Sequence, residues 1–76
     1  MPKLPVVNGR KAMRALERAG FYLDDTEGSH HTMRHPESGR RASVPVHAGR
    51  DLKPGTLHAI IREAGLTVEE FIALLK

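Results

Sequence analysis

The sequence predicts an α+β domain in which a three-stranded antiparallel sheet carries helices on one face, in the order α-β-β-β-α(-α). Three observations predict it: helical periodicity in residues 8–20, three short strand-like runs separated by turn residues between 21 and 46, and renewed helical periodicity after 57. Only the helices can cover the apolar face of such a sheet. Its other face is therefore expected to be open to solvent.

Each helix carries its own start and stop signals. Asn8 can cap the first, Gly20 can end it, and small apolar residues recur between them at helical spacing: Ala12, Ala15, Leu16 and Ala19. A second helix is predicted over residues 57–64. A third follows Thr67, which forms a predicted capping box with Glu70, while Leu66 and Phe71 occupy the positions of a hydrophobic staple.

Three strands are predicted over residues 21–25, 29–35 and 41–46. Pro36 halts the second, and Pro45 places the end of the third at a sheet edge or an irregularity, because proline cannot donate to a ladder. Met33 marks the core face of the second strand. Alternation then sends inward Phe21, Leu23, His31, Met33, His35, Ala42, Val44 and Val46, and outward Tyr22, His30, Thr32, Arg34, Arg41, Ser43 and His47.

Length and composition limit the classes of function. The 76 residues are expected to form one domain, residues 1–76, with a modest core and no deep pocket. The absence of cysteine excludes disulfide and thiolate chemistry. No apolar run approaches the length of a transmembrane helix, and residues 1–10 lack the apolar core of a signal peptide. A cytoplasmic protein is therefore expected.

Positive charge is unevenly distributed along the chain, whose net charge is +3. Residues 1–20 hold five Lys/Arg and one acid, residues 28–53 hold five Lys/Arg and two acids, and residues 21–27 hold three acids and no Lys/Arg. Such clusters are compatible with a polyanionic partner. Charge alone is equally compatible with an ordinary solvated surface.

Three of the five histidines lie within "GSHHTMRH", residues 28–35. A zinc site is disfavoured because His30 and His31 are adjacent on a strand and point to opposite faces, and because no cysteine or HExxH helix supports them. Ser29 and Ser43 lack the surroundings of a catalytic serine. His35 and His58 are expected to be merely solvated, and His31 to be half-buried support.

RNA cleavage is the chemistry that an exposed strand of this kind can support. RNA supplies its own nucleophile, the 2′-hydroxyl, so that the protein needs a proton acceptor such as His30 and a phosphate-binding cation such as Arg34. An RNA-binding module without turnover would use the same surface. The residues alone leave these two alternatives open.

Several ordered motifs resemble the HicA toxins of HicA–HicB toxin–antitoxin systems. They are "GF" at 20–21, "GSHH" at 28–31, "RHP" at 34–36, "VPVHAGRDLKPGTLHAII" at 44–61 and "AGLTVEEF" at 64–71, and the resemblance spans residues 7 to about 74. It implies a fold like a double-stranded-RNA-binding domain and a metal-independent ribonuclease that cleaves mRNA. It also implies a HicB antitoxin as the protein partner, in a toxin–antitoxin hetero-oligomer.

The resemblance also implies which residues act in catalysis and in RNA binding. The family's key histidine falls on His30, with His31 as the fallback, and Gly28 and Ser29 form the turn that presents it. His47 is at most an accessory. Together with the strand analysis, this assigns RNA binding to Gly28, Ser29, Tyr22, Arg34, Arg41 and His47, with no metal or other cofactor.

Overall fold

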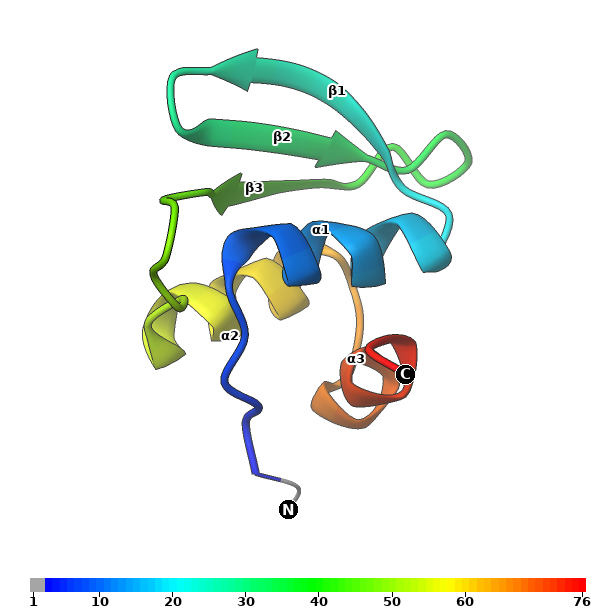
Figure 1. The fold of residues 1–76 in the computed structure, drawn as a ribbon. Helices are drawn as coiled ribbons and strands as arrows, with labels where there is room; N and C mark the ends of the chain where they lie inside the picture. Colours follow the sequence, from blue (N-terminus) through cyan, green and yellow to red (C-terminus); the bar gives the residue numbers. More distant parts are fainter. Residues whose placement is uncertain (1–2) are drawn as a thin grey trace.

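The computed structural model describes residues 3–76 and shows one antiparallel sheet with helices on one side of it (Figure 1). The elements are α1 (Gly9–Arg18), β1 (Tyr22–Glu27), β2 (His30–Arg34), β3 (Arg41–Pro45), α2 (Pro54–Glu63) and α3 (Val68–Leu74). This order confirms the predicted α+β class. Met1 and Pro2, which the predicted domain includes, lie outside the described residues.

The ends of the helices follow the signals in the sequence. The Asn8 side chain accepts a hydrogen bond from the backbone N–H of Lys11 at 2.9 Å. In α3 both halves of the capping box are formed, since the Glu70 N–H donates to the Thr67 hydroxyl at 3.1 Å and the Thr67 N–H donates to the Glu70 carboxylate at 2.8 Å. The predicted caps of α1 and α3 are thus confirmed. In residues 3–76 no helix has the length and apolarity needed to cross a membrane.

The core lies between the sheet and the helices. Its largest fully buried side chains are Phe71, Leu16, Met33, Leu57, Ile60 and Val44. Met33 and Val44 confirm the predicted inward face of β2 and β3. Helix α1 approaches β3 very closely at Gly9, where an added Cβ would lie 2.5 Å from the carbonyl oxygen of Pro45.

Strand β1 departs from the prediction. Leu23 pairs with Met33 and therefore shares its face, yet Leu23 is 47% exposed whereas Met33 is fully buried. Leu23 therefore lies on the predicted face of the sheet, but it is not buried there, because α1 and α2 pack against β3 and all six residues of β1 are exposed. A register shift between Leu23 and Asp25 further separates this strand from a regular ladder.

His35 is half-buried, so the inward direction given by strand alternation is confirmed and the expectation of a merely solvated side chain is wrong. Its half-buried ring packs edge-on against Phe21, with 5.1 Å between ring centroids. Its Nδ1 accepts from the backbone N–H groups of Glu37 and Ser38 at 3.2 and 3.4 Å. Gly20 lies against the same ring, since a Cβ there would come within 2.8 Å of Nε2. His35 therefore joins the turn after β2 to the end of α1.

Candidate functional site

A tight turn presents His30 at the start of β2. Gly28 adopts a φ of +60° there, a conformation that glycine takes without strain. β1 ends at Glu27 and β2 begins at His30, and the two residues are paired directly across the strands. The side chain of His30 is exposed. The structure thus places the predicted catalytic imidazole at the surface, beside the turn.

His31 has a different environment, on the opposite face of the same strand. It is half-buried, and its Nδ1 lies 3.1 Å from the carbonyl oxygen of Ser29. Because a carbonyl can only accept, Nδ1 is the donor. The same carbonyl also accepts from the backbone N–H of Val46 at 2.7 Å. The half-buried position of His31 agrees with strand parity, and the bond from Val46 joins the turn to the residue that follows β3.

The face of the sheet away from the helices carries three rows of cross-strand neighbours. From the turn outward they are Glu27, His30 and Pro45, then Asp25, Thr32 and Ser43, then Tyr22, Arg34 and Arg41. The structure therefore brings Tyr22, Arg34 and Arg41 together in one row. It does not place this row beside His30, because four residues of strand separate the two rows by about 13 Å. The immediate cross-strand neighbours of His30 are a carboxylate and a proline.

The loop after β3 forms a hollow next to the His30 row. The hollow has a volume of about 300 Å³ and begins at Pro45, the cross-strand partner of His30. Its charged and ionisable lining residues are His47, Arg50, Asp51 and Lys53. Figure 1 shows that the beginning of β2, the end of β3 and this loop all lie at the same end of the sheet. Of the residues predicted for the site, His47 is thus on the His30 side.

Three charged residues near His30 were missed by the sequence analysis: Glu27, Arg50 and Lys53. A signal for each was present. A two-residue turn at Gly28–Ser29 necessarily pairs Glu27 with His30, and antiparallel pairing of the second and third strands puts the chain that follows Pro45 next to the same turn. The predicted bounds of the strands were too imprecise to fix this register.

Possible metal ligands are spread apart in the part of the chain that the structure describes. Within residues 3–76 no three His, Asp or Glu side chains are grouped so that they could hold one ion. His30 and His31 project from opposite faces of β2, as strand geometry requires.

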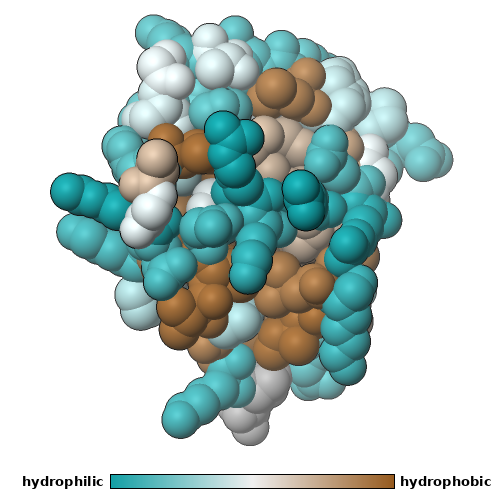
Figure 2. All heavy atoms as spheres, in the orientation of Figure 1, coloured by the Kyte–Doolittle hydropathy of each residue, from teal (hydrophilic) through white to brown (hydrophobic). Residues whose placement is uncertain are grey.

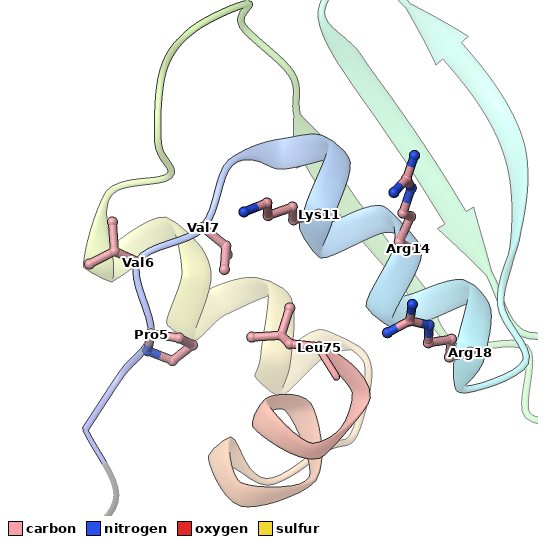
Figure 3. Close-up of a pocket in the computed structure, with 7 residues that line it drawn as sticks. All are labelled: Pro5, Val6, Val7, Lys11, Arg14, Arg18 and Leu75. Atoms are coloured by element: carbon pink, nitrogen blue, oxygen red, sulfur yellow. The ribbon is translucent and has the colours of Figure 1, made fainter.

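A second basic hollow lies on the helix side of the molecule. Lys11, Arg14 and Arg18 project from α1 above an apolar floor contributed by Pro5, Val6, Val7 and Leu75 (Figure 3). Its volume is about 370 Å³, and Val6 is 78% exposed. Figure 2 shows the same arrangement as brown apolar surface crossed by long hydrophilic side chains. This hollow gathers three of the five Lys/Arg of residues 1–20, but it lies on the side of the sheet opposite to His30.

Most of the chain, including the whole sheet, matches a known protein family. A family model described as the HicA toxin of bacterial toxin–antitoxin systems matches residues 9–66. This chain belongs to the HicA toxin family. The match covers α1, the whole sheet and α2, and so includes the turn, His30 and the hollow after β3. The comparison with curated proteins gives no match.

Membership of the family has two direct consequences. The protein is a toxin of a toxin–antitoxin system, and it has a cognate antitoxin as its partner. The resemblance of the "GSHH" and "VPVHAGRDLKPGTL" segments to this family is thereby confirmed.

Proposed function

We propose that this HicA toxin is an endoribonuclease that cleaves mRNA by general acid–base catalysis, without a metal, and so blocks translation in the cytoplasm. The observation that carries the proposal is the exposure of His30 directly after the Gly28–Ser29 turn, on the face of the sheet that no helix covers. An imidazole can both accept and donate a proton near neutral pH, and RNA brings its own nucleophile. A surface site is therefore sufficient for this reaction.

Cleavage of an RNA backbone needs two proton transfers. One group removes the proton of the 2′-hydroxyl, and another protonates the departing 5′-oxygen. His30 performs one of these transfers. Glu27 lies directly opposite His30 on β1 and supplies a carboxylate. The Cβ atoms of two residues paired in this way are about 5 Å apart. The pair therefore offers two proton-transfer groups to one phosphodiester.

The remaining predicted residues bind RNA at both ends of the sheet's open face, some beside His30 and some away from the bond that is cut. Gly28 and Ser29 hold the turn, and Arg34 and Arg41 bind a different phosphate of the same strand, since they lie about 13 Å along the sheet from His30. Tyr22 shares their row, is 43% exposed, and stacks on a base. His47 is an accessory group at the end of the sheet where His30 lies.

The antitoxin partner in this proposal is a HicB-type protein. It binds the toxin in a hetero-oligomer and covers the surface around His30, so that RNA cannot reach the imidazole. Co-expression with the neighbouring reading frame is the corresponding experiment. A stable complex and restored growth are expected.

His30→Ala and His31→Ala form a matched pair that tests the catalytic assignment. Purified wild type is expected to cleave mRNA in EDTA, and His30→Ala is expected to lose about 10²–10⁴-fold of that activity while its melting temperature stays close to wild type, because the side chain is exposed. His31→Ala is expected to lower the melting temperature, since it removes the bond to Ser29.

Four results would contradict the proposal. Undiminished cleavage by His30→Ala would show that this imidazole is not catalytic. Loss of activity in a fully folded His31→Ala would transfer the role to the other histidine. Wild-type protein that binds RNA and leaves it intact would indicate a binding module without turnover, and cleavage abolished by EDTA would require a metal.

A further inference from the structure

The hollow after β3 lies next to His30 and is not explained by the roles proposed so far. Its walls come from the end of β3, the loop 46–53 and the first turn of α2, where Thr56 lines it. At about 300 Å³ it is at the lower limit of small-molecule sites, which span about 300–1,000 Å³. It is large enough for part of an RNA chain to enter.

The loop that forms this hollow is held in place by backbone hydrogen bonds. The N–H of Val46 donates to Ser29 at 2.7 Å, the N–H of Arg50 donates to His47 at 3.1 Å, and the N–H of Leu52 donates to Val7 at 2.8 Å. Asp51 also forms an isolated bridge with Asn8. The hollow is therefore preformed and fixed relative to the His30 turn, which reduces the entropy lost when a ligand binds.

The chemistry of the lining matches a nucleotide. Arg50 and Lys53 provide two exposed cations against the single carboxylate of Asp51, so that the rim favours a phosphate. Pro45 and Leu52 are half-buried and provide an apolar surface on which a base can lie. A phosphate beside an apolar surface is the pattern of a single nucleotide unit, and Pro45 connects this surface directly to His30.

We infer that this hollow binds one unpaired nucleotide of the RNA, next to the bond whose cleavage His30 catalyses, with Arg50 and Lys53 holding its phosphate. A base in a duplex is stacked and paired, and it cannot enter a hollow of this kind without leaving its helix. The substrate at the point of cleavage is thus single-stranded RNA. The inference rests on the proposed ribonuclease function for its meaning, but its binding step can be measured separately.

The experiment uses a labelled single-stranded RNA octamer with 2′-O-methyl groups throughout, which lacks the nucleophile and cannot be cleaved. Binding is measured by fluorescence anisotropy for wild type, for Arg50→Gln/Lys53→Gln, and for Lys11→Gln/Arg14→Gln. The last variant removes the same charge from the hollow on the helix side (Figure 3). All four side chains are exposed, so each variant is expected to keep the wild-type melting temperature.

Arg50→Gln/Lys53→Gln is expected to weaken binding by about tenfold or more, since both cations that hydrogen-bond the phosphate are lost. The control variant is expected to lose at most about threefold in affinity, which is the contribution of non-specific electrostatic attraction to RNA. In a titration of ¹⁵N-labelled wild type, amide shifts are expected in residues 46–56 and at His30. A duplex of the same sequence is expected to bind at least about tenfold more weakly.

Several outcomes would overturn the inference: equal losses in the two double variants, amide shifts confined to α1, equal binding of the duplex, or no binding of the octamer by wild type. The failure of the proposed function is distinguishable from these. If wild type binds the octamer through the hollow but leaves unmodified RNA intact, the nucleotide site stands and the nuclease proposal fails. If it cleaves unmodified RNA while Arg50→Gln/Lys53→Gln binds and cleaves normally, the reverse holds.

Discussion

Replacing Gly9 by alanine should change the stability of the protein through two opposite effects, at the point where α1 packs against β3. In a helix, alanine is favoured over glycine by about 0.5–1 kcal/mol, because glycine loses more backbone entropy on folding. At this position, however, the added Cβ would lie 2.5 Å from the Pro45 oxygen and 2.9 Å from a methyl group of Val46. The first of these atoms belongs to the backbone of β3 and cannot move aside cheaply.

The expected result is a net loss of stability. Forcing an extra methyl into a packed contact costs about 1–3 kcal/mol, and a contact of 2.5 Å with a backbone oxygen belongs to the upper half of that range. Subtracting the gain in helix propensity of about 0.5–1 kcal/mol leaves a loss of about 1–2.5 kcal/mol, so that the melting temperature of a domain of this size falls by about 4–20 °C. Because Pro45 and Val46 lead into the loop of the nucleotide hollow, RNA binding should weaken as well.

Gly55→Ala is the matched control, since Gly55 lies in the first turn of α2 and a Cβ there would meet nothing within 4 Å. It is expected to raise stability by about 0.4–1 kcal/mol. Both variants are measured by urea denaturation and thermal melting monitored by circular dichroism. A Gly9→Ala protein as stable as wild type would refute the close approach of α1 to β3, and equal losses in both variants would show that helix starts here tolerate no side chain.

Three further substitutions test which side chains belong to the core. Because Phe71 is fully buried, Phe71→Ala should lower the free energy of unfolding, measured by urea denaturation, by about 3–5 kcal/mol. That is a large part of the total of about 4–11 kcal/mol expected for a chain of this length. A change within error would show that α3 does not contribute to the core. Leu23→Ser should change stability by less than about 0.5 kcal/mol, whereas Met33→Ala, its partner across the strands, should cost about 2–5 kcal/mol; similar losses at the two positions would show that Leu23 is covered after all.

Local signals in the sequence were sufficient for much of the fold. The capping box of Thr67 and Glu70 lies within one turn of chain, and the side-chain alternation around Met33 within one strand. Both depend on neighbours in sequence, and both predictions are confirmed. The exposure of His30 follows from the same alternation, since Met33 fixes which face of β2 is buried.

Features set by the packing of separate elements were not predictable in this way. The exposure of Leu23 depends on how far the helices extend beneath the sheet, and its apolar side chain gives no information about that. Strand alternation sends His35 inward, but it does not reveal that the ring packs on Phe21, a residue from the other end of a hairpin. The separation of Arg34 from His30, in contrast, could have been computed from the rise of a strand.

Both lateral borders of the sheet discourage another polypeptide from adding a strand. β1 carries Asp24, Asp25 and Glu27 and breaks its own regular pairing near Leu23, so that a second copy laid along it would bring carboxylates together on an uneven ladder. On β3 the N–H of Ser43 is directed to the Glu63 carboxylate at 3.4 Å, and Pro45 has no N–H to offer. Fibrillar stacking of such sheets is therefore disfavoured during the interval in which the chain has been released from its antitoxin.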